Sequence, residues 1–422
     1  MKSGPYVSSY YQATLHPTPA RPRLTGALEC DVCVVGGGIA GCSAALHLQE
    51  RGYRVVLLEE HRIGWGASGR SGAQVIAGVA AGQAKLKQLI GAADARRVWD
   101  LSVEGVALMR ELIARHGIDC DWVDGHMQVA VKPRHDVELR EELQMLRGDL
   151  NYPSVRYLPR EEVRSILSTR RYLSALYDAN GGHLHPLNYT LGLAKAAENA
   201  GARIFEDSRA LSFNEGTSIQ VHTADARVSC RHLVLCGNTR LGDVAPTLKS
   251  RIMSVGTYIV ATEPLGERLI ANNAAVSDLN WILDYFRHTP DGRLLFGGRV
   301  NYSGLSSFDA PAATRKRMMA VFPQLKDVKL DYAWGGELDI TLNRAPNFGR
   351  LGPDVYFLQG FSGHGMALTG IAGKLVAEAV AGTAERFDVF ARIPHRAFPG
   401  GAALRRPALV LAMLYYRLRD LL

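Results

Sequence analysis

Apolar and polar positions near the start of the chain predict a strand–helix–strand unit. The apolar run from Cys30 to Val35 predicts a buried strand, and the spacing of apolar residues over 39–51 predicts a helix. The glycines of 36–41 predict a tight turn between them, and a second apolar run over 54–59 predicts the next strand. Two strands joined by a helix in this way pair in parallel.

Farther along, the pattern becomes rich in strands and then returns to the first arrangement. Helices are predicted over 86–117 and 187–200. Several short apolar runs within 253–298 favour an antiparallel sheet. A last strand over 355–358 leads through a glycine-rich turn into a helix over 366–381. The pattern therefore predicts an α/β protein whose first domain is assembled from separate segments.

Length, composition and charge narrow the class of protein. The 422 residues are 47% hydrophobic, and a chain of this length usually forms more than one core, so two domains are expected. The 49 Lys and Arg residues against 41 Asp and Glu residues give a net charge of +8, but they are spread along the chain, so no nucleic-acid partner is expected. No apolar stretch has the length of a membrane span, and the first residues lack the pattern of a secretion signal. We expect a cytoplasmic protein.

The cysteines predict no metal site. Cys30 and Cys33 form a C-x-x-C string, but the string lies in a predicted buried strand and no second such pair completes a zinc site. Buried thiols are the expected state of these residues.

The turn after the first predicted strand has the spacing of a dinucleotide-binding motif. In the string formed by Gly36, Gly38 and Gly41, the first glycine allows the tight turn, the second lets the backbone approach a pyrophosphate, and the third packs helix on strand. The N-terminus of the following helix adds partial positive charge. Glu59 ends the second predicted strand, where a carboxylate accepts hydrogen bonds from ribose hydroxyl groups. An acidic residue there disfavours NADP.

The loop over 64–74 indicates which dinucleotide is bound. Its small residues let the backbone approach a large flat ligand, and Ser68 and Arg70 carry donors that suit anionic pyrophosphate oxygens. FAD is therefore favoured over NAD. A flexible surface loop is the alternative interpretation of the same composition.

These motifs resemble those of the D-amino-acid oxidase-like flavoprotein superfamily, and the second half of the chain is similar to its gamma-glutamylputrescine oxidase branch. The similarity to the branch rests on residues 284–287, 291–298, 334–336, 343–346, 360–365 and 398–419. One difference lies in the loop, which has Arg70-Ser71-Gly72-Ala73 where the branch commonly has Arg-Asn-Gly-Gly.

The resemblance implies a fold and a reaction. The implied fold is a discontinuous, Rossmann-like FAD-binding domain with a second α+β substrate domain built on a mainly antiparallel sheet. The implied reaction is oxidative deamination of an amine, gamma-glutamylputrescine or a related polyamine derivative, by hydride transfer to flavin N5 and hydrolysis of the imine. The expected boundaries are 28–90, 150–245 and 335–385 for the FAD-binding domain, 91–149 and 246–334 for the substrate domain, 1–27 for an extended N-terminal arm and 386–422 for a C-terminal tail helix.

FAD is expected to bind without a covalent bond, because no cysteine follows Cys236 and the cysteinyl attachment of some relatives lies in the C-terminal part of the chain. The turn over 360–366 is expected to bring backbone N–H groups and a positive helix end to the N1/O2 edge of the flavin, with His364 as a further donor. The predicted FAD-binding residues are Gly36, Gly38, Ala40, Gly41, Glu59, Glu60, Gly66, Ala67, Ser68, Arg70, Gly72, Gln74, Ala210, Gly237, Gly360, Gly363, His364, Gly365 and Met366.

A cationic amine that is desolvated beside a flavin requires carboxylates or aromatic faces. Asp339 is one candidate carboxylate, and Arg287 is expected to hold a substrate carboxylate such as a glutamyl group. Strand surface or core positions are the structural alternatives for these side chains. The predicted catalytic residues are Tyr285, Arg287, Trp334, Glu337 and His364.

Two other functions stay open at this point. An oxidase or dehydrogenase of a small amino acid, such as glycine, sarcosine or a D-amino acid, needs a cation for the substrate carboxylate close to the α-carbon. A non-catalytic flavin-binding subunit would hold a flavin that no amine reduces. The expected electron acceptor is O₂ or a quinone. The apolar segment over 407–419 has basic ends and is too short to span a bilayer; we expect it to pack on the body rather than lie on a membrane surface.

Overall fold

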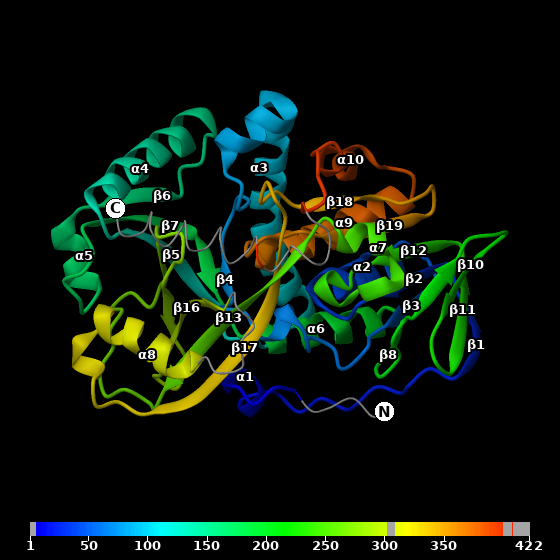
Figure 1. Ribbon diagram of the computed structural model, residues 1–422, viewed down its shortest axis with the longest axis horizontal. Coiled ribbons are helices and arrows are strands. Elements are labelled where there is room, and N and C mark those ends of the chain that lie inside the picture. Colours follow the sequence, from blue (N-terminus) through cyan, green and yellow to red (C-terminus); the bar gives the residue numbers. More distant parts are fainter. Residues whose placement is uncertain (1–5, 302–308, 400–406, 408–422) are drawn as a thin grey trace.

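A six-stranded sheet lies at the centre of the first part of the molecule (Figure 1). The computed structural model describes residues 6–301, 309–399 and 407. Five of the six strands run parallel, and β18 is antiparallel to its neighbour β19. The strand order is β18 (Asn347–Arg350), β19 (Val355–Gln359), β12 (His232–Leu235), β2 (Val32–Val35), β3 (Val55–Leu58) and β8 (Arg203–Phe205).

Helices cover one face of this sheet. Helix α2 (Ile39–Gln49) contacts both α6 (Pro186–Asn199) and α9 (Gly365–Val380), and it is buried on nearly all sides. Helices α2 and α9 approach closely, since a Cβ added at Gly373 would lie 2.6 Å from the backbone nitrogen of Ala44. The motif helix is therefore fixed between two other helices.

A four-stranded sheet covers the opposite face. Alternate residues of β2 point to opposite sides: Val32 and Val34 face the helices, and Cys33 and Val35 face the small sheet. This explains why the strand is apolar without interruption. The small sheet has the order β1 (Gly26–Glu29), β11 (Ala226–Cys230), β10 (Ile219–His222) and β9 (Ser212–Asn214).

A nine-stranded, mainly antiparallel sheet forms the second part of the molecule. Among the strands that the structure describes, its one parallel pair is β14 (Ala275–Asp278) with β5 (Val123–Ala130). Strand β6 (Val155–Leu158) pairs with β7 (Ser174–His183) off the main path. The other strands follow in the order β17 (Leu330–Ile340), β13 (Met253–Thr262), β16 (Leu294–Asn301), β15 (Tyr285–His288), β14 (Ala275–Asp278), β5 (Val123–Ala130), β7 (Ser174–His183) and β4 (Gln74–Val75).

The second sheet has its own cores. Phe286 and Phe296 stack with ring centroids 5.7 Å apart, beside apolar residues of α8 (Ala310–Val321). A smaller cluster lies between this sheet and α4 (Pro133–Gln144). The shorter helices are α5 (Arg160–Ile166), α7 (Pro246–Lys249) and α10 (Glu385–Ala391).

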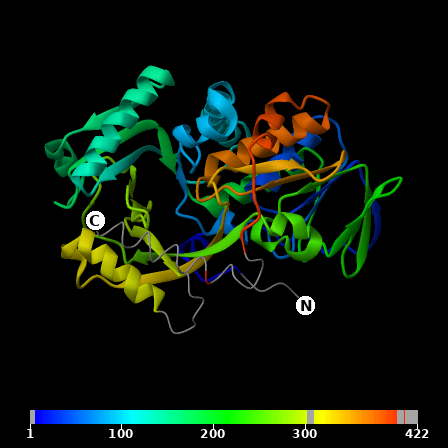
Figure 2. The ribbon, with the colours of Figure 1, turned by 45° about the horizontal axis from the view of Figure 1, so that its top comes forward.

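Helix α3 (Gln83–His116) connects the two parts. It bends at Gly91, whose φ is 80°, and ends at Gly117, which is left-handed with a φ of 57°. In Figures 1 and 2, α3 lies between the region of α4 and the region of α9 and α10. It packs on α9, so most of it belongs to the core of the first part.

The predicted fold class is confirmed, but the observed sheets divide the chain differently from the predicted boundaries. The sequence places residues 150–183 in the FAD-binding domain, whereas β6 and β7 pair within the nine-stranded sheet. Residues 335–340 also belong to that sheet as part of β17. Conversely, the part of α3 after residue 91 packs mainly with the first domain, although Trp99 contacts the second. Strand pairing and helix packing over long sequence distances decide these assignments.

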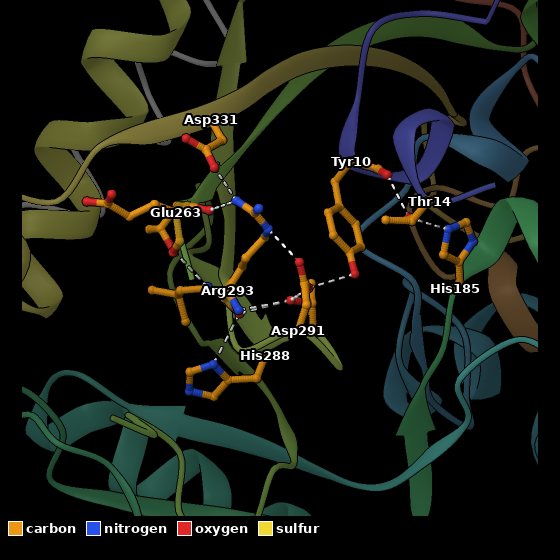
Figure 3. A network of polar contacts seen from close by, with 11 residues as sticks. Tyr10, Thr14, His185, Glu263, His288, Asp291, Arg293 and Asp331 are labelled. Carbon is orange, nitrogen blue, oxygen red and sulfur yellow. Dashed lines mark hydrogen bonds and ion pairs between the residues drawn. The ribbon is translucent and has the colours of Figure 1, made fainter. Parts of the chain in front are cut away.

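The N-terminal arm is only partly extended, because it contains the short helix α1 (Tyr10–Ala13). A polar network joins this helix to neighbouring elements (Figure 3): the Tyr10 hydroxyl donates to Asp291 at 2.9 Å, and Thr14 contacts the His185 ring at 3.1 Å. Arg293 pairs with both Asp291 and Asp331 in the same network. Tyr10 and Tyr11 of the arm are thus part of the core.

The C-terminal prediction is tested only in part. Helix α10 lies within the predicted tail except for its first residue, Glu385. Residues 400–406 and 408–422, with nearly all of the predicted apolar tail segment, lie outside the described residues. Within the described ranges, no single helix has the length and apolar character of a membrane span; α9 and α10 pass that test only as a pair bent by 118°.

Candidate active site

A cavity of about 780 Å³ begins at the carboxyl ends of β2, β3 and β12 and continues over the nine-stranded sheet. The carboxyl ends of parallel strands are where open α/β sheets bind ligands. Residues of β5, β7, β13, β14 and β17 line the second half of the cavity. One volume therefore joins the predicted dinucleotide site to the second domain, and its size suits a bound cofactor and substrate.

The glycine turn is shaped by close backbone contacts. Gly36 has a φ of 111°, and a Cβ there would lie 2.7 Å from the carbonyl oxygen of Cys236. A Cβ at Gly41 would lie 1.9 Å from the carbonyl oxygen of Gly36, so this position packs helix on turn and does not line the cavity. Gly38 precedes α2, lines the cavity and carries no side chain that would fill it. A phosphate group can therefore approach the start of α2.

Two carboxylates follow β3. Glu59 accepts hydrogen bonds from the backbone nitrogens of Gly37 at 2.6 Å and His61 at 2.8 Å, which fix its orientation. Burial raises the pKa of Glu59 to about 7. Glu60 also lines the cavity and pairs with Arg209 at 3.4 Å.

The loop over 64–74 closes on the glycine turn. The Ser68 hydroxyl accepts a hydrogen bond from the backbone nitrogen of Ile39 at 3.0 Å, so it caps α2 while also lining the cavity. The Arg70 guanidinium lies 3.9 Å from the centroid of the Trp65 ring, and its Nε donates to the Trp65 carbonyl at 2.7 Å. The loop therefore presents a fixed guanidinium to the cavity.

Two predicted catalytic residues support this loop from outside the cavity. Trp334 is 4% exposed, and its indole nitrogen donates to the Arg70 carbonyl at 3.0 Å. Arg287 is also 4% exposed, and it donates to the carbonyls of Gly72 at 3.2 Å and Leu184 at 2.9 Å. Neither side chain lines the cavity. The assignment of Arg287 to a substrate carboxylate is therefore wrong, because backbone oxygens already engage its donors.

The turn before α9 reaches the same cavity. His364 lines it at the N-terminus of the helix, and burial lowers the pKa of its ring to about 4, so the ring is neutral at pH 7. Gly360 does not line the cavity; its backbone nitrogen donates to the carboxylate of Asp339. Asp339 therefore holds the turn in place, and burial raises its pKa to about 6.

Tyr285 and Glu337 line the cavity from the second domain. The Tyr285 ring packs so tightly on two glycines that a Cβ added at Gly72 or Gly297 would lie 2.5 or 2.3 Å from it. Glu337 is an exposed residue of β17 on the cavity lining. The other predicted FAD-binding residues on the lining are Gly36, Ala40, Gly66, Ala67, Gly72, Gln74, Ala210, Gly237, Gly363, Gly365 and Met366.

Sequence reasoning missed most of the lining contributed by the second domain. His126 lies on β5, where its Nε2 contacts the Ser277 hydroxyl at 3.1 Å, and burial lowers its pKa to about 4. Cys236 and Asn238 follow β12, and the rule that ligands bind at carboxyl ends of parallel strands would have identified them. Other polar and aromatic residues on the cavity lining that the sequence did not predict include Trp99, Gln128, Glu142, Tyr152, Asp178, Tyr258, Asp278 and Arg344.

Comparison with known families explains this architecture. A family profile described as FAD dependent oxidoreductase matches residues 31–379. The chain belongs to this FAD-dependent oxidoreductase family. The superfamily resemblance seen in the sequence is thereby confirmed, and the protein is an oxidoreductase.

Curated relatives of this FAD-dependent oxidoreductase match it over nearly its whole length. The chain is 41% identical over 420 residues to the gamma-glutamylputrescine oxidoreductase of Escherichia coli (strain K12), covering 98% of each chain. It is 39% identical to a probable oxidoreductase, OrdL, of Haemophilus influenzae, covering 98% of this chain and 97% of the relative. A glycine oxidase of Bacillus licheniformis is more distant, at 23% identity over 83% of this chain and 93% of the relative.

Solved structures show the same fold. The L-amino acid deaminase from Proteus vulgaris superposes with a TM-score of 0.73 at 18% identity, covering 88% of this chain and 100% of that one. The glycine oxidase from Bacillus cereus superposes with a TM-score of 0.72 at 19% identity, covering 87% and 99%.

The cavity of this FAD-dependent oxidoreductase fits the cofactor of its family. Trp65 Nε1, Arg70 Nη2 and His364 Nδ1 are buried on the lining and have no hydrogen-bond partner in the described part of the chain. Buried polar atoms require partners, and a ligand with phosphate and ring heteroatoms supplies them. No group of three or more His, Cys, Asp or Glu residues suited to a metal ion occurs within the described ranges.

Proposed function

We propose that this oxidoreductase deaminates an amine, gamma-glutamylputrescine or a related polyamine derivative, and that it holds FAD without a covalent bond. The observation that carries the proposal is the continuity of one cavity from the glycine turn to a region with aromatic and acidic side chains. The relative that shares 41% identity over 98% of this chain bears the name of that amine. A cytoplasmic location and transfer of electrons to O₂ or a quinone belong to the same proposal.

Residues of the chain have separate tasks in this reaction. Arg70, Ser68 and the start of α2 would hold the pyrophosphate of FAD, and Glu59 would accept hydrogen bonds from the ribose hydroxyls. The N-terminus of α9 and His364 would offer positive potential and a hydrogen-bond donor to the flavin ring. When bound, FAD supplies the acceptor for the two electrons that the amine loses. The amine becomes an imine by loss of a hydride and a proton, and water converts the imine into an aldehyde and ammonia.

The walls near the second domain favour an amine over a small amino acid. This part of the lining offers the aromatic faces of Tyr258 and Tyr285 and the carboxylate of Glu337. Such groups suit a cationic substrate that is removed from bulk water when it binds. Burial leaves His126 and His364 neutral at pH 7, since their pKa values lie at about 4. These rings therefore add no positive charge that would repel the amine.

Oxidation of a small amino acid is the second candidate function. Arg344 lines the cavity, and its charge contributes to lowering the pKa of His364. A cation in this part of the cavity is what the carboxylate of an amino acid would require.

Anaerobic reduction of the bound flavin by polyamines, glutamylated amines and amino acids tests the proposal. We expect bleaching of the flavin absorbance by gamma-glutamylputrescine at a rate at least tenfold above that with glycine, sarcosine or D-alanine. Faster reduction by an amino acid would select the second candidate, and a flavin that no compound reduces would indicate a non-catalytic subunit. Acid precipitation is expected to release free FAD; flavin retained in the pellet would contradict non-covalent binding.

A further inference from the structure

The far end of the cavity is a chamber formed by residues that no cofactor motif includes. It lies beside α4, β6 and β7, and we define the chamber by Trp99, Glu142, Tyr152, Leu176 and Asp178. The rings of Trp99 and Tyr152 meet edge to face, with centroids 5.3 Å apart. These residues come from α3, α4, the segment before β6, and β7, so the chamber lies where α3 meets the second domain.

One of the two carboxylates in the chamber is fully engaged by the protein. Asp178 accepts hydrogen bonds from the Tyr152 hydroxyl at 2.9 and 3.1 Å and from the backbone nitrogen of Asn180 at 2.9 Å. Asn180 in turn donates to the Tyr152 hydroxyl at 3.1 Å. Asp178 therefore fixes the aromatic wall in position.

The other carboxylate has no partner. Glu142 lies in the last turn of α4 and lines the cavity, and no hydrogen bond or ion pair joins it to any described residue. Burial, with a smaller contribution from the nearby Glu138 carboxylate, raises its pKa to about 7. Glu142 is half-buried and lines the cavity. A carboxylate that is largely shielded from water gains from a cation or a hydrogen-bond donor beside it, so the chamber suits a positively charged or hydrogen-bond-donating group.

We infer that the chamber binds an ammonium group at the far end of an extended amine substrate, remote from the carbon–nitrogen bond that is oxidised. Glu142 supplies the charge, and the faces of Trp99 and Tyr152 suit the cation and the methylene chain beside it. This inference rests on the proposed function and extends it, because it makes Glu142 the residue that distinguishes a diamine from a monoamine. Glycine and sarcosine carry no second ammonium group and gain nothing from the chamber.

The test compares holoenzyme reduction by α,ω-diamines of increasing length with reduction by 1-aminoalkanes of the same length. For the wild type at pH 8, we expect the apparent Kd of the best diamine to be at least tenfold below that of its matched monoamine. Glu142→Gln is expected to remove this preference while the rate at saturation changes by less than twofold. Glu138→Gln is the matched control, since Glu138 is exposed one turn earlier on the same helix; it should keep the preference.

The outcomes separate this inference from the proposed function. If no amine reduces the wild-type flavin, the proposed function fails. If amines reduce it but diamines and monoamines bind equally at every length, or if Glu142→Gln keeps the preference, the chamber does not bind an ammonium group. The wild-type comparison holds even if the variant does not fold. If Glu142→Gln changes only the rate at saturation and leaves the apparent Kd of diamines unchanged, the inference is also overturned, because a binding group remote from the reacting bond acts on the apparent Kd.

Discussion

The guanidinium of Arg287 donates to the hydroxyl of Tyr11 at 3.1 Å. Tyr11 donates onward to the carbonyl of Ser71 at 2.9 Å, while Arg287 Nε reaches the next carbonyl, that of Gly72, at 3.2 Å. Tyr11 is 0% exposed. The N-terminal arm and β15 thus fix two successive peptide groups of the loop that is predicted to hold FAD, and we propose that the arm contributes to cofactor binding in this way.

Tyr11→Phe tests this role. The substitution keeps the ring but leaves the Ser71 carbonyl and one Arg287 donor without a partner, a loss of about 1–3 kcal/mol. Because the loop then loses its fixed geometry, we expect FAD affinity to fall about tenfold, measured by titrating the apoprotein and following flavin fluorescence.

A second tyrosine provides the control for Tyr11→Phe. The Tyr53 hydroxyl donates to the Val380 carbonyl at 3.3 Å, away from the loop. Tyr53→Phe should leave FAD affinity unchanged. Equal affinities for the two variants would show that the arm does not position the loop.

Gly41→Ala is expected to prevent FAD binding. The added Cβ would lie 1.9 Å from the carbonyl oxygen of Gly36, so the turn and α2 would have to separate. Gly370→Ala in α9 is the matched control, because a Cβ there meets nothing within 4 Å and alanine is the better helix former by about 0.5–1 kcal/mol. We expect colourless Gly41→Ala protein and yellow Gly370→Ala protein with an equal or higher Tm; a yellow Gly41→Ala protein would refute the assigned packing role.

The cofactor half of the site could be predicted from the sequence, because the motifs that form it are local. The glycine turn, Glu59 and the loop over 64–74 act through backbone conformations that short motifs determine. Helix bounds were equally accessible: the helix predicted over 187–200 is observed as Pro186–Asn199. In these segments, apolar spacing and proline or glycine positions decide the structure.

The substrate half of the site could not be predicted from the sequence, because it depends on pairing between strands that are far apart along the chain. His126 and Asp178 lie opposite each other in β5 and β7, and no sequence pattern states that these strands are neighbours. The same reason explains the Arg287 error, since its position in β15 predicts a strand residue but not the carbonyls that surround it. Glu142 carried no signal, because one acidic residue in an amphipathic helix is ordinary.

His185→Asn is expected to change how stability depends on pH. His185 Nδ1 accepts from the backbone nitrogen of Asn188 at 3.1 Å, so the neutral ring caps α6, and burial lowers its pKa to about 3. In the unfolded chain the pKa is about 6.5, so between pH 6.5 and 3 only the unfolded state takes up this proton. Stability conferred by the neutral ring is present above pH 6.5 and falls by about 1.4 kcal/mol per pH unit below it.

Asparagine also caps helices but does not titrate. In urea unfolding measured from pH 7.5 to 5, the free energy of unfolding of the variant should therefore fall less steeply with decreasing pH than that of the wild type. Thr14→Val is the control, since it removes the partner of Nε2 at 3.1 Å but keeps the ring; its slope should match the wild type. Parallel curves for His185→Asn and the wild type would exclude this histidine as a source of acid sensitivity.

Arg70 is expected to determine FAD affinity through both its charge and its shape. Its Nη2 is buried without a partner, and its guanidinium lies 3.9 Å from the centroid of the Trp65 ring. Arg70→Met removes a charge-assisted hydrogen bond of about 1.5–3 kcal/mol, so we expect the Kd for FAD to rise about 10- to 150-fold. Arg70→Lys keeps the charge but loses the planar fork and the stacking, so its Kd for FAD should lie between those of the Arg70→Met variant and the wild type.

Arg54→Met is the control for these variants. It removes an exposed ion pair with Asp31 on the surface and should leave the Kd for FAD unchanged. If the Arg70→Lys variant binds FAD no better than the Arg70→Met variant and both fold, the planar guanidinium is required and the charge alone is not sufficient. If the Arg70→Met variant binds FAD as tightly as the wild type, Arg70 does not contact the cofactor.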